Sequence, residues 1–380
     1  MPARDLWSRI QKQLHGRAES EQLRILRGHL DSLHDEWKGP YKDLRDRLRR
    51  QVRRLEGHDA VRSRAGQHDP FHIKRQGEAT VVLVGTPNTG KSTLLRALTG
   101  AATIVADYPF STSQPVPGML SGDGGALQLI DTPPVVPGLA DGQGPGRPLL
   151  HLLSLADVLA VVVNATDDAT GNTQIVFDEL ATTGIGAIAG PLATTLQPRG
   201  KGGLRFVGRP LDREQEQTAR SLVAAAHVEH AEIAVRTGFD AEQLRRQLDG
   251  DILLPVVLVV TSAQQPGADI GIAAMQRRWP HLPMVATESG QPASLEPIRS
   301  SLLASMGRMP VLLLERAAVD GAGSIVLMPL ASDVAAVAAR VGQQERLKGA
   351  RIWGTSVARP GQAVSLQHVV ASGDQIFLQS

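Results

Sequence analysis

The chain has 380 residues, of which 42% are apolar and 21% charged, so it is long enough for two or three globular domains. It has no cysteine, which excludes disulfides and thiolate metal sites and fits a reducing compartment. No run approaches the roughly 18 apolar residues that a transmembrane helix needs, and the N-terminus lacks an apolar signal core. We therefore expect a cytoplasmic protein that has no membrane partner.

The net charge of +2 hides an uneven distribution. Residues 1–77 hold 18 Lys and Arg against 11 Asp and Glu, a net charge of +7, and the remainder holds 22 against 27, a net charge of −5. A basic segment ahead of a mildly acidic body indicates either a polyanionic partner or a solvated helical face. The candidate contact for RNA is an arginine-rich face that comprises Arg45, Arg49, Arg50, Arg53 and Arg54.

Helices are predicted from residue 3 to about residue 57, because Leu, Ile or Val recurs there at helical spacing. The apolar series consists of Leu6, Ile10, Leu14, Leu23, Leu26, Leu30, Leu33, Leu44, Leu48, Val52 and Leu55. Gly39-Pro40 breaks the pattern before the third helix. Residues 58–77 are polar and resemble a linker, so that residues 1–77 form a basic helical N-terminal region.

From residue 78 onward, short apolar runs alternate with helical patterns, which is typical of an α/β domain with a parallel sheet. The predicted strands are 80–84, 126–130, 158–163, 255–260 and 283–286, and the predicted helices are 91–98, 147–153, 173–180 and 293–306. Residues of about 190–250 interrupt this alternation and indicate a small α+β insertion, with strands at 204–207 and 232–235 and helices at 212–227 and 240–250. The domain thus spans 78–308, and residues 309–380 form a separate strand-rich module.

The segment GTPNTGKS, from Gly85 to Ser92, carries the pattern G-x-x-x-x-G-K-S between a buried strand and a helix. Its glycines let the loop curl so that backbone N–H groups point at phosphate oxygens. Lys91 should reach the β- and γ-phosphates, and the Ser92 hydroxyl should ligate Mg²⁺. The residues predicted to bind the nucleotide here are Gly85, Thr86, Pro87, Asn88, Thr89, Gly90, Lys91, Ser92 and Thr93.

Two polar residues follow the loop in the order that such a Mg²⁺ site needs. Asp131 ends the apolar run ALQLI, where a carboxylate can hold Mg²⁺ through water. Thr112 lies between the loop and Asp131, and its hydroxyl can close over the γ-phosphate and the metal. We therefore expect Ser92, Thr112 and Asp131 to hold Mg²⁺, and Lys91 and Thr112 to act on the reacting phosphate.

At these residues the sequence resembles the Obg-like GTPases, most closely the branch called developmentally regulated GTP-binding proteins. The segment ADYPFSTSQPVPG (106–118) is similar to that family's switch I, and DTPPVVPGLADGQGPGR (131–147) is similar to its switch II. The run from 350 to 378 resembles the family's TGS domain, a small β-grasp fold. The resemblance implies a P-loop GTPase domain with N-terminal helices, an α+β insertion and a C-terminal TGS domain (309–380).

The resemblance also implies a GTPase that acts with the ribosome or its RNA, sometimes with a small protein partner. It suggests that Asn88 helps hold K⁺ beside the phosphates, because relatives with asparagine at this position do so. That ion would offset the charge that develops in phosphoryl transfer. The alternative is that Asn88 only suits the turn.

Switch II departs from the family pattern. Its fourth position, normally a glycine whose N–H contacts the γ-phosphate, is Pro134, which has no N–H to donate. The contact is then missing or displaced towards Val135. Val135 also occupies the position of the water-orienting glutamine of Ras-like enzymes, although Obg-like relatives are apolar there too. These departures predict slow hydrolysis, and they leave open a nucleotide-binding adaptor with little hydrolysis.

The base-reading motif departs as well. In place of Asn-Lys-x-Asp the sequence has Thr261-Ser-Ala-Gln264. The loss of the charged acceptor for guanine costs on the order of 1.5–3 kcal/mol. Gln264 offers one acceptor and one donor and suits adenine or guanine, and Thr287 lies where a backbone contact to the base is expected. GTP is the expected nucleotide, but ATP is an alternative, because the related Obg-like ATPases also carry a TGS domain and an altered motif.

Overall fold

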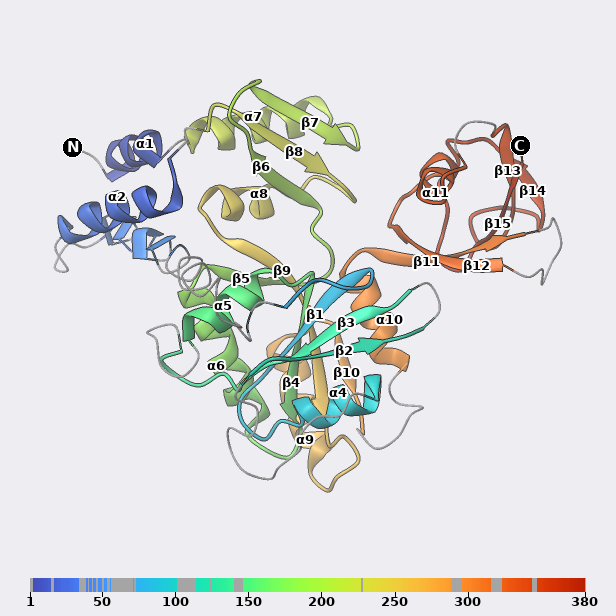
Figure 1. The fold of residues 1–380 in the computed structure, drawn as a ribbon, viewed down its shortest axis with the longest axis horizontal. Helices are drawn as coiled ribbons and strands as arrows, with labels where there is room; N and C mark the ends of the chain where they lie inside the picture. Colours follow the sequence, from blue (N-terminus) through green and yellow to red (C-terminus); the bar gives the residue numbers. More distant parts are fainter. Residues whose placement is uncertain are drawn as a thin grey trace.

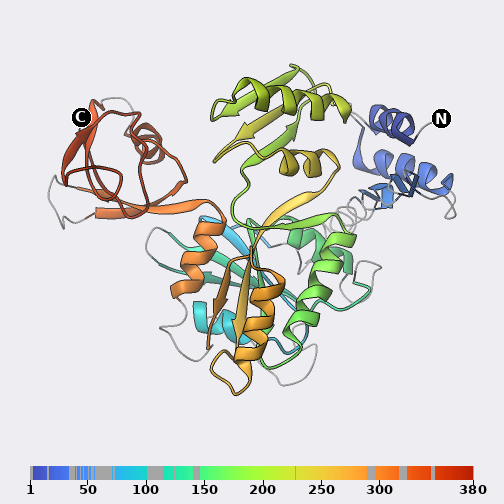
Figure 2. The same ribbon diagram turned by 180° about the vertical axis from the view of Figure 1, so that it is seen from behind.

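The structure of the protein is a computed structural model. It describes residues 3–14, 17–33, 39, 41–42, 44–45, 47–49, 51–52, 55, 71, 73–100, 114–122, 125–139, 146–226, 228–288, 296–315, 323–343 and 347–379. N-terminal helices, a large sheet with flanking helices, an inserted unit and a C-terminal unit can be followed in chain order (Figure 1). Seen from either side, the inserted unit lies between the N-terminal helices and the C-terminal unit (Figure 2). Within the described residues, no helix is long and apolar enough to cross a membrane.

The N-terminal helices pack on one another through their predicted apolar faces. They are α1 (Ala3–Leu14) and α2 (Glu19–Asp31), and the described residues between 41 and 55 are also helical. Ile10, Leu26 and Leu48, one from each segment, are fully buried in a shared core. An ion pair between Arg47 and Asp249 joins this region to the inserted unit. The period of the apolar residues thus identified the faces that pack.

The large sheet is mostly parallel, with strand order β10-β9-β4-β1-β3-β2, and β5 pairs with the first half of β9. Only the β2–β3 pair in this path is antiparallel. Its strands are β1 (Ala79–Val84), β2 (Val116–Leu120), β3 (Leu127–Asp131), β4 (Val158–Asn164), β5 (Ile185–Ile188), β9 (Ile252–Thr261) and β10 (Met284–Ala286). β1 is buried along its whole length, as expected of a central parallel strand covered on both faces.

Helices cover both faces of this sheet and create two apolar cores. The flanking helices are α4 (Lys91–Thr99), α5 (Gly146–Ser154), α6 (Ala169–Thr182), α9 (Ala268–Arg278) and α10 (Glu296–Ser305). α4 and α10 pack on one face, and α5, α6 and α9 pack on the other. Each fully buried Leu or Val contributes about 1.5–3 kcal/mol relative to its exposed state. This α/β architecture brings the loops after β1, β3, β9 and β10 together at the carboxyl ends of the strands, where ligands bind in such folds.

The inserted unit is a small three-stranded sheet covered on one face by two helices. Its elements are β6 (Thr194–Pro198), β7 (Leu204–Gly208), α7 (Arg213–Ala225), β8 (Ala231–Val235) and α8 (Ala241–Leu248). β8 lies in the centre, parallel to β7 and antiparallel to β6. Asp212 and Asp240 cap the two helices by accepting hydrogen bonds from backbone N–H groups three residues on. These two aspartates therefore explain where the helices begin.

The C-terminal unit has a five-stranded sheet of order β12-β11-β15-β13-β14 and one helix. Its elements are β11 (Arg308–Leu314), β12 (Gly323–Pro329), α11 (Val334–Arg340), β13 (Gly349–Trp353), β14 (Gln362–Val364) and β15 (Gln375–Gln379). β11 and β15 pair in parallel, and the other pairs are antiparallel. Val334 and Val337 of α11 pack into the core of this sheet.

The structure contains elements that the sequence did not predict, namely β2, β5, β6 and α9. β2 includes Pro117 and Gly118, and β5 has only four residues, so neither shows a clear strand pattern. β9 is longer than the predicted strand at 255–260, because its first residues extend beyond β4 to pair with β5. Pairing between strands, which leaves little trace in sequence periodicity, produces the differences at β2, β5, β6 and β9.

Candidate functional site

The loop after β1 curls tightly before it enters α4. Gly85 lies against β4, where a Cβ atom would stand 2.3 Å from the carbonyl oxygen of Val162, so a larger residue cannot fit. Gly90, the N-terminal cap of α4, has a left-handed backbone with φ of 87°. Asn88 is also left-handed, with φ of 62°, and its side chain is exposed. Asparagine tolerates this conformation well, which gives a local reason for this residue.

The rest of the loop presents two kinds of side chain. Thr86 and Thr89 are buried, whereas Pro87 is half-buried and Thr93 is exposed. The Thr89 hydroxyl donates to the Thr86 carbonyl at 3.2 Å and thereby braces the turn. Within the described residues, the buried Thr86 hydroxyl oxygen has no hydrogen-bond partner. A polar atom without a partner in this loop is consistent with a polar ligand at the site.

Lys91 begins α4 and folds back over the loop. Its side chain is 7% exposed, and Nζ donates to the carbonyl oxygens of Gly85 at 3.0 Å and Thr86 at 2.8 Å. Burial lowers the pKa of Lys91 to about 8, and the nearby Asp131 carboxylate opposes that shift. An anionic ligand such as a phosphate would stabilise the charged form of this buried ammonium.

Ser92 and Asp131 lie side by side at the start of α4 and the end of β3. The Ser92 hydroxyl donates to Oδ2 of Asp131 at 2.5 Å, and Asp131 is only 1% exposed. A hydroxyl and a carboxylate are the oxygen ligands that Mg²⁺ prefers, so these two side chains fit that ion. Thr112, the third predicted ligand, lies outside the described residues.

The segment after Asp131 is fixed against β1. The Thr132 hydroxyl donates to the Leu83 carbonyl at 2.7 Å, and the Val135 N–H donates to the Gly85 carbonyl at 3.0 Å. The Val135 side chain is 1% exposed and belongs to the apolar core. The expectation that Val135 could donate to the γ-phosphate in place of Pro134 is wrong for this conformation, because the Val135 N–H is already bonded to Gly85.

Thr261, the last residue of β9, joins the loop after β9 to the P-loop (Gly85–Ser92). The Thr261 hydroxyl lies 2.9 Å from the carbonyl oxygen of Thr89 and 3.1 Å from that of Val163. Ser262, the next residue, is left-handed with φ of 56°. The altered motif thus still connects the predicted base-reading loop to the phosphate loop, although its side chains differ.

Gln264 and Thr287, the two predicted base contacts, lie on adjacent loops. The Ala263 N–H donates to the Thr287 carbonyl at 3.3 Å, and the Thr287 N–H donates to the Val260 carbonyl at 2.8 Å. The Thr287 side chain is buried. The Thr287 N–H is thus bonded to β9 in this structure, and the predicted backbone contact to a base stays a prediction for this loop.

Sequence reasoning overlooked Glu288. Its Oε2 accepts from the backbone N–H of Gln264 at 3.4 Å, so that a carboxylate lies beside the loop whose motif has no aspartate. The side chain is half-buried. The available signal was an acidic residue directly after Thr287, at the end of the strand next to β9.

The arginine-rich helix is less exposed than its sequence indicates. The Arg45 side chain is 7% exposed and lies beside the N-terminal core, so it does not belong to a solvated face. Arg49 is half-buried, and Arg50, Arg53 and Arg54 lie outside the described residues. The expectation of an exposed arginine face is therefore wrong at Arg45. Periodicity identifies the leucine face but cannot tell which neighbouring positions a second helix covers.

Comparison with known proteins agrees with this geometry. Residues 80–185 match the family described as 50S ribosome-binding GTPase. An uncharacterized GTP-binding protein of Methanocaldococcus jannaschii is 24% identical over 86% of this chain and 85% of its own length. The human developmentally regulated GTP-binding protein 2 is 24% identical over 83% and 86%, and a Dictyostelium discoideum homologue of protein 1 is 30% identical over 52% and 54%.

Solved structures are more distant. The NFeoB protein of S. thermophilus bound to GDP·AlF4⁻ and K⁺ is 14% identical over 60% of this chain and 63% of that chain, with a TM-score of 0.32. Era in complex with MgGDPNP and a 16S ribosomal RNA segment is 16% identical over 60% and 56%, with a TM-score of 0.34. Likenesses this weak carry no information about function.

Proposed function

Because the chain has a P-loop GTPase domain and is related to the developmentally regulated GTP-binding proteins, we propose that it binds GTP with Mg²⁺ and hydrolyses it slowly. The observation that carries the proposal is the grouping of Lys91 and Ser92 of the P-loop with Asp131 at the end of β3. Lys91 turns from the loop carbonyls to the β- and γ-phosphates, and Ser92 and Asp131 hold Mg²⁺. The bound ion supplies positive charge that stabilises the transferring phosphoryl group.

Hydrolysis is proposed to be attack of water in line on the γ-phosphate. The chain's contribution is mainly charge neutralisation by Lys91 and positioning by the backbone N–H groups of the loop. Pro134 offers no N–H, and the Val135 N–H is bonded to Gly85, so the segment after Asp131 gives little help. This is why the proposed reaction is slow. K⁺ beside Asn88 is a proposed second ion that raises the rate, and Thr112 is a proposed third Mg²⁺ ligand.

A second candidate function is a nucleotide-binding adaptor with little hydrolysis, and Pro134 is the feature that favours it. Single-turnover hydrolysis of GTP, measured with and without KCl, separates the two functions. The hydrolase predicts phosphate release above that of a Lys91→Ala variant, with a higher rate in KCl. Release equal to that of the variant in both salts would establish the adaptor.

The position of Glu288 supports guanine over adenine. The guanine edge presents two donors, N1–H and the 2-amino group, and a carboxylate can accept from both. Adenine presents an acceptor at N1, which a carboxylate repels. Glu288 is thus proposed to replace the aspartate that the Thr261–Gln264 segment lacks, although it comes from the neighbouring loop.

Titration with fluorescent GTP, ATP and their diphosphates tests the choice of base. The proposal predicts that GTP binds at least about tenfold more tightly than ATP, which corresponds to about 1.4 kcal/mol. Equal affinities would refute the guanine assignment and would favour the alternative of an ATP-using protein.

The proposed setting is the cytoplasm, and the proposed partner is the ribosome or its RNA, with a small protein partner proposed in addition. The net charge of +7 on residues 1–77 and the family described as 50S ribosome-binding GTPase support RNA as the partner. Cosedimentation with ribosomes at increasing salt measures this association. An unchanged bound fraction between low and high salt would contradict binding through phosphate contacts.

A further inference from the structure

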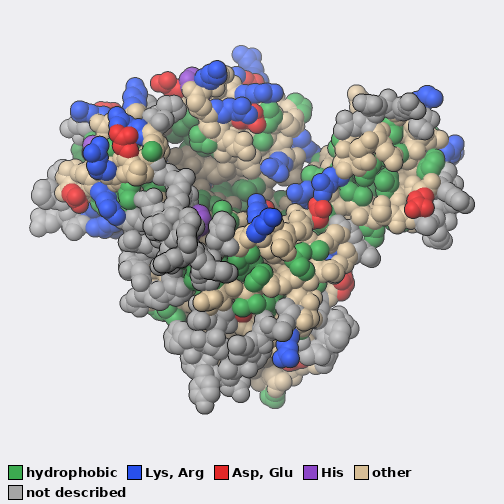
Figure 3. Space-filling model, viewed as in Figure 1, with side chains coloured by type: hydrophobic (Ala, Val, Ile, Leu, Met, Phe, Trp, Pro, Cys, Tyr) green, Lys and Arg blue, Asp and Glu red, His purple; other side chains and the backbone are tan. Residues whose placement is uncertain are grey.

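A cleft lies at the edge of the large sheet opposite the P-loop. Its volume is about 1120 Å³, and its walls include the first residue of β1, Ala79, whereas Gly85 follows the last residue of that strand. Three parts of the chain enclose it, represented by Asp157 before β4, Val207 of the inserted unit and Leu330 of the C-terminal unit. Figure 3 shows the molecule hollowed between the inserted unit and the sheet, with Lys and Arg side chains near this hollow.

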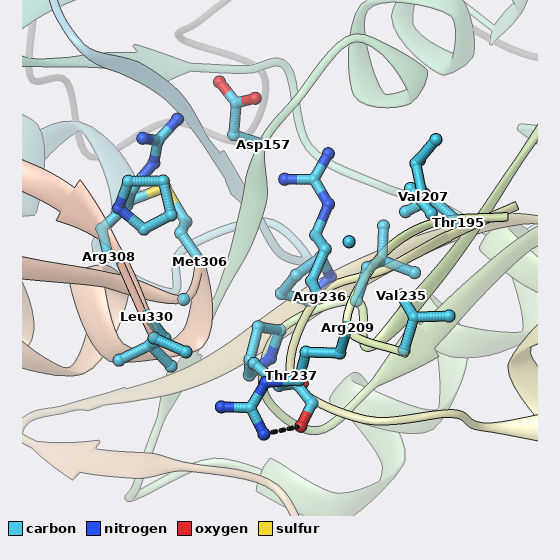
Figure 4. Close-up of a pocket in the computed structure, with 18 of the residues that line it drawn as sticks. Asp157, Thr195, Val207, Arg209, Val235, Arg236, Thr237, Met306, Arg308 and Leu330 are labelled. Atoms are coloured by element: carbon cyan, nitrogen blue, oxygen red, sulfur yellow. Dashed lines mark hydrogen bonds between the residues drawn. The ribbon is translucent and has the colours of Figure 1, made fainter. Parts of the chain in front are cut away.

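Three arginines from two walls face this cleft. Arg209 and Arg236 come from the inserted unit, and Arg308 begins β11 (Figure 4). Arg209 donates to the Thr237 carbonyl at 3.2 Å. Within the described part of the chain, none of the three forms an ion pair with a carboxylate. Their positive charges are therefore available to a ligand.

The two carboxylates in the walls do not neutralise these arginines. Asp157 pairs with Arg75 at 2.6 Å and accepts from the Thr80 N–H at 2.8 Å. Asp333 caps α11 by accepting from the Ala336 N–H at 2.8 Å. Both carboxylates therefore already have partners, and the cleft carries an excess of positive charge.

The backbone holds the arginines in place. β7 and β8 run parallel, so Arg209 and Arg236, which follow their last residues, emerge at the same edge of the small sheet. The Arg209 N–H donates to the Val235 carbonyl at 2.9 Å, and the Arg236 N–H donates to the Ala193 carbonyl at 2.8 Å. Gly208, with φ of 91°, lies so close to Val235 that a Cβ atom would stand 2.2 Å from its carbonyl oxygen. The backbone from which both arginines leave is thus fixed, and their guanidinium groups point to different parts of the cleft: that of Arg209 lies at the Thr237 carbonyl, and that of Arg236 points to the side of Asp157 and Arg308 (Figure 4).

From this arrangement we propose that the cleft binds a single strand of RNA through its phosphates, at a site separate from the nucleotide site. A ligand that reaches arginines on two walls must carry several anionic groups, and guanidinium groups pair well with phosphate. A single strand can turn its phosphates to both walls, while apolar residues such as Pro191 and Leu192 contact its sugars. No aromatic side chain lines the described cleft, so binding depends on the backbone rather than on base sequence. This inference rests on the proposed association with RNA.

The experiment compares two triple variants of the full chain by fluorescence anisotropy with a labelled 20-nucleotide poly-U RNA. The cleft variant carries Arg209→Glu, Arg236→Glu and Arg308→Glu. The control carries Arg213→Glu, Arg277→Glu and Arg359→Glu, which reverse three exposed charges outside both the cleft and the basic N-terminal region. Both variants change the net charge equally, so a difference between them reports the location of the RNA. Binding of GTP by each variant verifies that its nucleotide domain is folded.

The cleft variant should bind poly-U about 30-fold more weakly, and its slope of log K against log salt should fall by about 2, since each phosphate contact on a single strand contributes about 0.7. The control variant should lose less than about threefold. Equal losses in the two variants would place the RNA elsewhere and overturn the inference. Absence of RNA binding by the unaltered chain would instead refute the proposed association itself. Binding of an acidic peptide that is lost only in the cleft variant, with RNA binding intact, would assign the cleft to a protein partner.

Discussion

At the phosphate end of the nucleotide site, Lys91 donates to the backbone carbonyls of the loop, and Ser92 donates to Asp131. At the base end, one hydroxyl joins the two loops and a carboxylate comes from a neighbouring strand. The backbone N–H of Gln264, a predicted base contact, donates to this carboxylate, which belongs to Glu288. Every nucleoside triphosphate carries the same phosphates, so the first end can bind any of them. Only the second end can select a base, and there the chain departs from its relatives' pattern.

The largest effect expected concerns the phosphate end. Lys91→Met should weaken binding of GTP and ATP alike by about 100-fold or more, because each charge-assisted hydrogen bond to phosphate contributes about 1.5–3 kcal/mol. Titration with fluorescent nucleotides measures both affinities. Lys348→Met, which removes an exposed lysine of the C-terminal unit, should leave them unchanged. A loss for GTP alone would show that Lys91 does not act through the phosphates.

At the base end, a substitution of Glu288 should change the affinities for two nucleotides in opposite directions. Glu288→Gln should weaken GTP binding by about tenfold to 30-fold and strengthen binding of xanthosine triphosphate, whose 2-oxo group can accept from the new amide. Affinity for ATP should change little by comparison. Glu296→Gln, also acidic and exposed, is the matched control. A parallel loss for GTP and xanthosine triphosphate would mean that Glu288 only supports the loop.

The pKa of Lys91 makes the phosphate end sensitive to pH. With a pKa of about 8 in the nucleotide-free protein, Lys91 loses its proton above pH 8, while phosphate binding needs the charged form. The dissociation constant for GTP should therefore rise about tenfold between pH 7 and pH 9. Lys91→Arg, whose guanidinium stays charged, should show a weaker but nearly pH-independent affinity over this range. An equal pH dependence in the arginine variant would assign the effect to another group.

The same pKa predicts the direction of a stability change in the nucleotide-free protein. Because the folded-state pKa lies below the ordinary 10.5, the folded protein binds fewer protons than the unfolded chain between about pH 8 and 10.5. Lys91 thus adds to the free energy of unfolding as pH rises through this window, by up to about 3 kcal/mol. Urea unfolding at pH 8 and pH 10, compared with Lys91→Met, measures the difference. A larger gain in the methionine variant would contradict it.

The smallest effect concerns the segment that follows Asp131. Pro134→Gly introduces a backbone N–H at this position and should raise the single-turnover rate of GTP hydrolysis by about fivefold, less than a preorganised donor gives. Pro133→Gly is the control, since it loosens the same buried segment at the neighbouring position. Equal acceleration in both variants would attribute the gain to flexibility rather than to a donor.

The phosphate end and the base end also differ in how much of each could be predicted from the sequence. The P-loop and its flanking strand and helix are encoded in contiguous residues, and Asp131 was recognised by its place at the end of an apolar run, so their placement beside one another was predictable. The position of Glu288 beside the Gln264 loop was not predicted, because it depends on β9 and β10 lying side by side. The cleft was not found either, since its arginines come from three separated segments. Arg45 was misjudged for a related reason, because the periodicity of one helix does not show which of its positions the rest of the chain buries.

Strand β9 connects the cleft at one end of the large sheet with the P-loop at the other. Its ten residues span about 30 Å. Leu254 and Pro255, near its beginning, line the cleft, and Thr261, at its end, holds the P-loop at Thr89. Pairing with β4, β5 and β10 ties the strand into the sheet along its length, so we expect any displacement of it to involve the whole strand. If a ligand in the cleft changes the affinity for the nucleotide by some factor through β9, the nucleotide must change the affinity for that ligand by the same factor. One measured coupling constant would then describe both directions of signalling.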